Sequence, residues 1–247
     1  MDSGEIKLGC IAFPIVPGRR EPNDRSEMVT QLLFGENYKV LEENKKWILI
    51  RNELDKYECW IDRKQHTEVA NSIDLNETLK SPLSSIECNG EFHQIPMGSH
   101  AVKGKFAIGG IEYSFHLNES STDKNPLDFG KELLGAPYLW GGKSILGVDC
   151  SGLAQVAFSC AGIQLPRDAY QQAEYGETVD FIETAKPGDL AFFDNEEGRI
   201  THVGILTGEG TILHASGSVR IEKIDHEGIF DGERYTHSLR IIKRLAI

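Results

Sequence analysis

The residue types best suited to nucleophilic chemistry are a cysteine and two histidines in the second half of the chain. Cys150 lies between Asp149 and Ser151, and apolar residues recur at helical spacing from there to residue 160. A cysteine in the first turn of a helix meets unpaired backbone N–H groups and the positive end of the helix dipole, which predicts a lowered thiol pKa. The alternative is a cysteine buried for packing, but its polar neighbours favour a reactive thiol.

Two histidines can serve such a thiol if the chain after residue 200 folds as a hairpin. If Thr207 faces Thr211 across the turn, Gly204 faces His214. His202 and His214 then share one face as diagonal neighbours, ~7–8 Å apart at the backbone. This arrangement predicts His202 as a general base and His214 as the residue that fixes its tautomer and orientation.

A zinc site made by Cys150, His202 and His214 is the competing interpretation, although the sequence shows no supporting outer-shell pattern. We therefore predict neither a metal nor a cofactor. The other histidines are expected to be ordinary surface or core residues, at positions 66, 93, 100, 116, 226 and 237.

Two aromatic residues precede the cysteine in a turn rich in glycine and proline, Gly135 to Gly142. This turn can carry Tyr138 and Trp140 to the site. A phenol near Cys150 can position the nucleophile or donate to a developing oxyanion. Trp140 is also compatible with a role as a core anchor.

The elements that must position these residues form an α+β domain over 126–247. A helix is expected over 126–135, ending at Gly135, and another over 150–161, followed by Gly162. Strands are expected at 189–193, 201–207, 211–215 and 239–245.

The residues before this domain predict two small β-barrels, at 1–66 and 67–118, and a polar linker at 119–125. The first barrel is indicated by the runs YKVLEE, KWILIRN and ECWIDRK, and the second by SSIECN, GSHAVKGKFAI and GIEYSFHL.

Composition narrows the classes of partner. The 247 residues include 26 basic and 38 acidic ones, for a net charge of −12, which disfavours nucleic acid and anionic membranes. Five cysteines without a C-x-x-C pair indicate neither a disulfide framework nor a thiolate zinc site. The N-terminus does not read as a signal peptide, which favours a cytoplasmic protein, or a periplasmic or exported one if a leader has been removed. We expect a monomer.

Six motifs in order, GAPYLWGG, DCSGL, PRDAYQQ, KPGDLAFF, THVGI and ILHAS, resemble the NlpC-type cell-wall peptidases over about residues 125 to 247. The resemblance implies a papain-like fold, with a helix packed on an antiparallel sheet. It implies Cys150 as nucleophile, His202 as general base, His214 as the third triad member and Tyr138 as the tyrosine beside the nucleophile.

The N-terminal region is similar to the bacterial SH3-like domains that precede peptidases of γ-D-glutamyl-L-diamino-acid bonds. In those enzymes the first barrel covers the cleft and helps to bind the free amino end of the substrate. The resemblance implies that Asp149 and Ser151 bind this end, with Glu27 and Tyr57 as candidates from the barrel.

Arg167 is a further candidate, for a substrate carboxylate. The alternative is a structural salt bridge between Arg167 and Asp168 or another neighbour. Where many relatives have Ser or Thr after this Arg-Asp pair, the chain has Ala169, so one contact to the amino end is absent or replaced.

The implied activity is hydrolysis of the γ-D-glutamyl-L-diamino-acid bond in free peptidoglycan stem peptides, in cell-wall peptide recycling or turnover. The substrate would be a small muropeptide with an unblocked N-terminal L-Ala, and the product L-Ala-D-Glu. Its ammonium would be held by carboxylates such as that of Asp149. An amidase or acyltransferase of the same fold, and a non-catalytic cell-wall-binding protein, are the alternatives.

Overall fold

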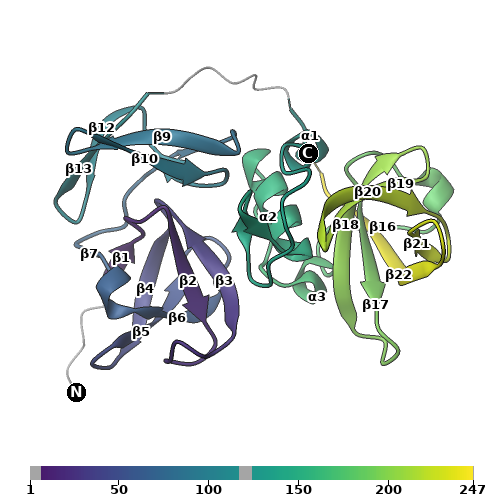
Figure 1. Ribbon diagram of the computed structural model, residues 1–247, viewed down its shortest axis with the longest axis horizontal. Helices are drawn as coiled ribbons and strands as arrows, with labels where there is room; N and C mark the ends of the chain where they lie inside the picture. Colours follow the sequence, from purple (N-terminus) through teal and green to yellow (C-terminus); the bar gives the residue numbers. More distant parts are fainter. Residues whose placement is uncertain (1–6, 117–123, 247) are drawn as a thin grey trace. The chain divides into compact units, whose positions relative to one another are not determined.

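The computed structural model describes residues 7–116 and 124–246, which divide into two compact units, Met1–Ser120 and Ser121–Ile247 (Figure 1). Most of the predicted linker at 119–125 lies outside the described residues. Among the helices of the described ranges, none is long and apolar enough to cross a membrane.

The first unit begins with a seven-stranded antiparallel sheet in the order β3-β2-β6-β5-β4-β1-β7. Its strands are β1 (Leu8–Cys10), β2 (Ile15–Arg19), β3 (Met28–Leu33), β4 (Asn37–Glu43), β5 (Trp47–Asn52), β6 (Glu58–Asp62) and β7 (Glu68–Val69). The three strands expected from YKVLEE, KWILIRN and ECWIDRK are confirmed as β4, β5 and β6. Their alternating apolar residues, such as Ile48, Ile50 and Ile61, fill one core.

The second part of this unit is a four-stranded sheet in the order β10-β9-β13-β12 beside a two-stranded β8–β11 pair. These strands are β8 (Glu77–Thr78), β9 (Leu83–Cys88), β10 (Glu91–Pro96), β11 (His100–Ala101), β12 (Gly104–Ile108) and β13 (Ile111–Phe115). Its core includes Cys10 and Phe34 from the first sheet, and Tyr113 donates a hydrogen bond to the carbonyl of Ala12 (3.1 Å). The boundary predicted after residue 66 therefore falls inside one compact unit.

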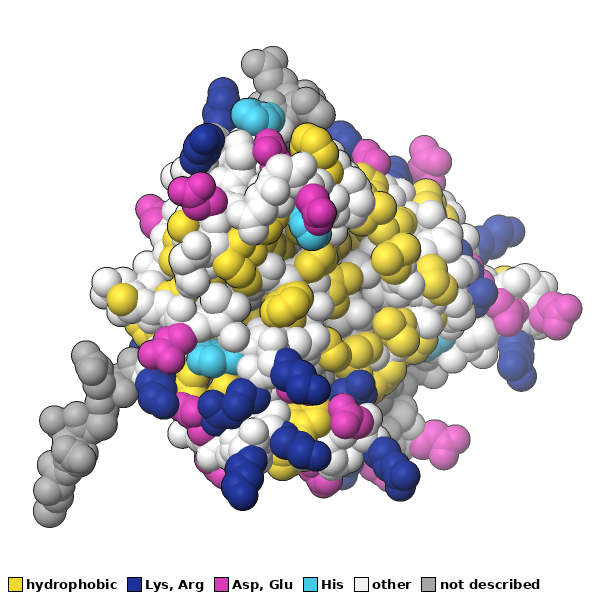
Figure 2. All heavy atoms as spheres, turned by 60° about the vertical axis from the view of Figure 1, so that its left-hand side comes forward, with side chains coloured by type: hydrophobic (Ala, Val, Ile, Leu, Met, Phe, Trp, Pro, Cys, Tyr) yellow, Lys and Arg dark blue, Asp and Glu magenta, His cyan; other side chains and the backbone are white. Residues whose placement is uncertain are grey.

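Charged side chains of both signs are interspersed on the face drawn in Figure 2, with exposed hydrophobic side chains between them. The negative net charge of the chain thus does not appear there as a continuous acidic surface.

The second unit is built on a ring of antiparallel strands in the order β22-β17-β18-β19-β20-β21, which closes because β21 also pairs with β22. The strands of the ring are β17 (Leu190–Asp194), β18 (Ile200–Gly208), β19 (Thr211–Ser216), β20 (Ser218–Ile224), β21 (Gly228–Phe230) and β22 (Tyr235–Arg244). Outside the ring, β16 (Glu177–Val179) pairs with β22. A separate two-stranded pair is formed by β14 (Lys143–Ser144) and β15 (Gly147–Val148). Side chains of Phe193, Leu206, Ile212 and Ile229 belong to the core of this unit.

Helices cover the outer side of β18 and β19 (Figure 1). These are α1 (Pro126–Lys131), α2 (Cys150–Cys160) and α3 (Ala169–Gln172). The strands and helices expected for this unit are present, although α1 is shorter than predicted and β22 begins earlier. The elements that were not predicted are α3, β14, β15, β16, β20 and β21.

The start of α2 is fixed by a cap and by a close approach of backbone. Asp149 is the N-cap residue, and its side chain accepts a hydrogen bond from the N–H of Gly152 (2.7 Å). A Cβ on Gly152 would lie 2.2 Å from the carbonyl oxygen of Gly142, which itself accepts a hydrogen bond from the N–H of Asp149. Glycine is therefore required where the helix meets this loop.

We expect Gly152→Ala to lower the free energy of unfolding by about 1–3 kcal/mol, because a methyl group there collides with backbone that is itself hydrogen-bonded. Gly130→Ala in α1 is the matched control, since its Cβ would meet the end of the Leu213 side chain, which can turn aside. Urea unfolding followed by circular dichroism measures both. Equal losses in the two variants would contradict the close-approach explanation.

Candidate active site

Cys150 occupies the first position of α2 and is only 6% exposed. Burial raises the pKa of its thiol to about 12, and the charge of Asp149 adds to this effect. Hydrogen bonds from the backbone of Val203 and Ser151 oppose the rise, as does Arg167. The predicted lowering of the pKa at the helix start is therefore wrong in direction, because desolvation outweighs the helix terminus.

The two histidines share one face as predicted, although Thr211 pairs with Gly208 across a β-bulge rather than with Thr207. Gly204 pairs with His214, and His202 Nε2 lies 2.9 Å from His214 Nδ1. A Cβ on Gly204 would lie 2.6 Å from Cδ1 of Ile212 and 3.0 Å from the Cβ of His214, so a side chain there would crowd the strand that carries His214. Because His202 uses Nε2 in this hydrogen bond, Nδ1 is the ring nitrogen that the bond leaves available.

A third histidine, His237, packs on His202, although the sequence predicted an ordinary surface or core residue there. The rings of His202 and His237 are stacked with centroids 4.2 Å apart. Burial lowers the pKa of His202 well below its usual value, and His237 and His214 lower it further. The predicted strand at 239–245 begins two residues after His237, whereas β22 begins at Tyr235 and includes it. The sequence therefore did not place His237 on a strand of this sheet.

Asp149 and Arg167 form a buried ion pair. Arg167, 1% exposed, donates from Nη2 to Asp149 Oδ2 (2.6 Å), and from Nη1 to Asp149 Oδ1 (3.1 Å) and Ser151 Oγ (2.8 Å). The Asp149 carboxylate also accepts from Ser151 Oγ and from the N–H of Gly141. Arg167 thus has a structural partner, Asp149 rather than Asp168, and does not present its charge to a substrate.

A cavity of about 300 Å³ adjoins the histidines and is lined by Tyr138, Thr201, His202, Ser216 and His237, among others. Burial raises the pKa of Tyr138 to about 12, with Cys150 and Asp149 contributing, so its hydroxyl stays protonated and able to donate. The backbone N–H of Tyr138 donates to the carbonyl of Gly217 (2.9 Å), which holds the phenol at this cavity. Trp140 is 56% exposed, so it is not a core anchor.

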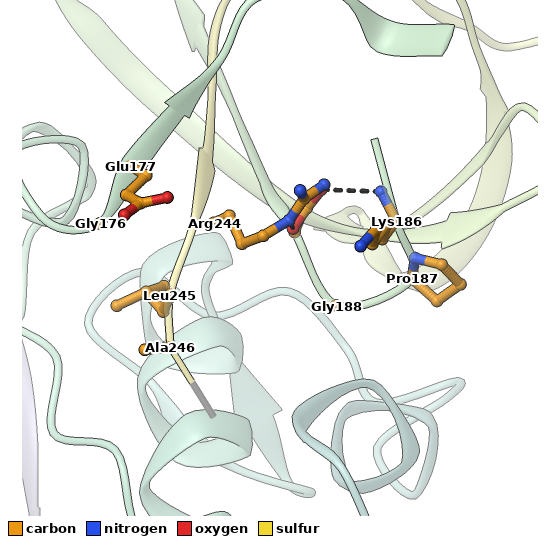
Figure 3. Close-up of a pocket in the computed structure, with 9 residues that line it drawn as sticks. Gly176, Glu177, Lys186, Pro187, Gly188, Arg244, Leu245 and Ala246 are labelled. Carbon is orange, nitrogen blue, oxygen red and sulfur yellow. Dashed lines mark hydrogen bonds and ion pairs between the residues drawn. The ribbon is translucent and has the colours of Figure 1, made fainter. Parts of the chain in front are cut away.

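A larger cavity of about 470 Å³ lies in the same unit beside the end of β22 (Figure 3). Two of its charged groups are paired with each other, because Arg244 donates twice to the Asp189 carboxylate (2.6 and 2.8 Å), which also accepts from the backbone N–H of Lys186. The smaller cavity is lined by His202 and His237 and the larger one by no histidine, so the smaller one is the candidate site.

The candidates from the first barrel are found in the other compact unit. Glu27 forms an ion pair with Arg20 (2.7 Å) just before β3, and Tyr57 packs against the core of the first sheet just before β6. Their role toward a substrate stays a prediction from the resemblance.

No group of three or more His, Cys, Asp and Glu side chains is arranged to hold a metal ion within residues 7–116 and 124–246. The zinc interpretation of Cys150, His202 and His214 therefore has no support in the geometry of this site.

Comparisons with known proteins match both units. Residues 135–240 match the NlpC/P60 family, and residues 18–65 match the bacterial dipeptidyl-peptidase SH3 domain. The γ-D-glutamyl-L-lysine dipeptidyl-peptidase of Bacillus subtilis is 32% identical over 219 residues, which is 75% of this chain and 71% of the relative. The protein of the same name from Bacillus cereus is 26% identical over 241 residues, 81% of this chain and 70% of the relative.

Among solved structures, an NlpC/P60 family protein from Bacillus cereus superimposes with a TM-score of 0.78 at 19% identity, covering 96% of this chain and 99% of that one. At this identity the likeness concerns the fold.

Breaking the buried ion pair should be costly. We expect Arg167→Met to lower the free energy of unfolding by about 3–5 kcal/mol, because it leaves the Asp149 carboxylate buried with an unbalanced charge. Arg199→Met serves as the control, since Arg199 pairs with Glu197 at the surface (3.4 Å), and it should cost less than about 1 kcal/mol. Similar losses in the two urea titrations would show that Arg167 is not a buried structural cation.

The stacking of His237 on His202 leads to a prediction about the pH dependence of kcat/KM. A base of lowered pKa stays unprotonated in mild acid, so the acid limb of kcat/KM for peptide hydrolysis should lie below pH 6.5. His237→Gln removes a group that lowers the pKa of His202, so the limb should move to higher pH. His226→Gln, at an exposed position, should leave the limb in place. A limb unmoved in His237→Gln would contradict the assigned contact.

Proposed function

The chain belongs to the NlpC/P60 family of cysteine peptidases, and we propose that it hydrolyses the γ-D-glutamyl-L-diamino-acid bond of free peptidoglycan stem peptides. In this proposal Cys150 is the nucleophile, His202 the general base and His214 the residue that orients it. The observation that carries the proposal is the set of contacts around β18. Cys150 meets the backbone of Val203, and the adjacent His202 is hydrogen-bonded to His214 at the cavity.

The protonation states of the free site indicate how attack would begin. The raised pKa of Cys150 keeps the thiol protonated, and the lowered pKa of His202 keeps the imidazole neutral. The Sγ proton would therefore pass to Nδ1 of His202 as Sγ bonds to the carbonyl carbon. Tyr138 can donate its hydroxyl proton in a hydrogen bond to the oxyanion that develops.

The tetrahedral adduct would then collapse. The C–N bond breaks, and the amino group of the diamino acid leaves with the proton that His202 returns. A thioester between Sγ and the D-glutamyl carboxyl remains. His202 would next take a proton from water, whose oxygen attacks the thioester and releases L-Ala-D-Glu with the thiol restored.

The geometry of the site changes how the free amino end of the substrate would be recognised. Because the charge of Asp149 is balanced by Arg167, its carboxylate contributes by holding Ser151 and the helix start rather than as an unpaired anion. Ser151 Oγ donates to Asp149 and accepts from Arg167, so a second lone pair is left for a substrate ammonium. The exposed ring of Trp140 would pack on the peptide.

Incubation with L-Ala-γ-D-Glu-meso-diaminopimelate, followed by mass spectrometry, tests the proposal. We expect release of L-Ala-D-Glu, and no release above the enzyme-free level by Cys150→Ala. Cys160→Ala is the matched control, because Cys160 is also buried in α2 but ends the helix, and it should retain activity. If the unsubstituted chain does not cleave the peptide, the proposed peptidase activity is refuted. That result is expected of a non-catalytic cell-wall-binding protein.

The same peptide with an acetylated amino end tests recognition separately. Loss of one charge-assisted hydrogen bond should lower kcat/KM by more than about tenfold. Equal rates on both peptides would refute recognition of the free amino end and leave the peptidase reaction intact. An N-acyl substrate cleaved faster than the free peptide would favour an amidase.

A further inference from the structure

A carboxylate extends the histidine pair on the side away from Cys150. Glu222 Oε2 lies 2.8 Å from His214 Nε2, and the Glu222 side chain is 13% exposed whereas that of His214 is fully buried. Because Arg220 pairs with His214 in the β19–β20 register, Glu222 is the diagonal neighbour of His214, as His202 is on the other side. A single row, His202–His214–Glu222, thus crosses three adjacent strands.

The hydrogen-bond directions along this row follow from its end. A carboxylate only accepts, so His214 must donate Nε2–H to Glu222. A neutral His214 then has its lone pair on Nδ1, which must accept from His202 Nε2–H. A neutral His202 with its proton on Nε2 has its lone pair on Nδ1, the nitrogen left for the thiol.

We propose that Glu222 is a positioning residue that sets the tautomers of both histidines, so that His202 presents an unprotonated Nδ1 to Cys150. This inference rests on the proposed function, and it adds a fourth residue to the site. When the thiol proton moves from Sγ to Nδ1, the imidazolium keeps its Nε2–H donated to His214, and His214 keeps its Nε2–H donated to Glu222. No proton travels along the row.

The charged groups around Glu222 allow a positioning role to be distinguished from a loss of folding, because they act on the histidines in opposite directions. His214 faces it from β19, Arg220 pairs with it on β20 (3.0 Å), and His237 on β22 lies within its electrostatic influence. Glu222 raises the pKa of His214, whereas Arg220 lowers it. Protonation of His214 would remove the Nδ1 lone pair that accepts from His202, so removing the two charges should move the acid limb of kcat/KM in opposite directions.

Nitrogen-detected NMR of the histidine side chains in the unsubstituted chain at neutral pH tests the tautomers without any substitution. The expected result is that His202 and His214 both carry the proton on Nε2. A proton on Nδ1 of His202 would overturn the proposal, whatever the chain does to a peptide. Absence of peptide cleavage would instead refute the proposed function and leave this result standing.

Kinetics of Glu222→Gln test the consequence. An amide can donate as well as accept, so the tautomers are no longer fixed, and kcat should fall by about 10–100-fold with KM little changed, as for other partners that orient functional histidines. The acid limb of kcat/KM should move to lower pH. A kcat within about fivefold of the unsubstituted value, or a loss confined to KM, would overturn the proposal.

Arg220→Gln is the matched variant on the same strand. It removes the other ion partner of Glu222 and leaves the carboxylate–imidazole hydrogen bond, so kcat should stay within about fivefold and the acid limb should move to higher pH. A loss equal to that of Glu222→Gln, with both limbs displaced in the same direction, would show that strand β20 matters only as structure and would overturn the proposal.

Discussion

The buried ion pair between Asp149 and Arg167 is the interaction on which the site depends. One carboxylate caps α2 through Gly152, holds the loop before the helix through Gly141, and fixes Ser151. It can accept all these hydrogen bonds because Arg167 supplies both the compensating charge and two more donors. The position of Cys150 against β18 follows from this arrangement, since the residue lies between Asp149 and Ser151.

Burial then decides the chemistry that this position permits. A thiol enclosed by protein is stabilised in its neutral form, and so are imidazoles that lie close together. The site therefore relies less on a preformed charge than on orientation. His202 is held by a hydrogen bond to His214 and by stacking on His237, and in the proposed reaction this orientation would determine which nitrogen takes the proton of Cys150. Substrate binding in such a site must provide the charge stabilisation that water does not.

The sequence predicted those parts of the site that depend on local periodicity. The register of the hairpin followed from one turn, and the start of α2 followed from a polar residue before an apolar helical pattern. Properties set by distant residues were not predictable in this way. The direction of the Cys150 pKa depends on burial, and the partner of Arg167 lies 18 positions away. His237 and Glu222 were missed because they lie on strands whose limits the pattern did not define. In the first unit, the core shared through Cys10 and Phe34 likewise depends on contacts between distant segments.

The most direct test of Cys150 as a nucleophile served by His202 is the rate of carbamidomethylation of each cysteine by iodoacetamide, measured by peptide mass spectrometry. The account predicts that Cys150 reacts faster than Cys10, Cys59, Cys88 and Cys160, with loss of activity, and that His202→Gln abolishes this advantage while leaving the other four rates unchanged. A Cys150 that reacts no faster than the other four cysteines, or equally fast in both proteins, would contradict it.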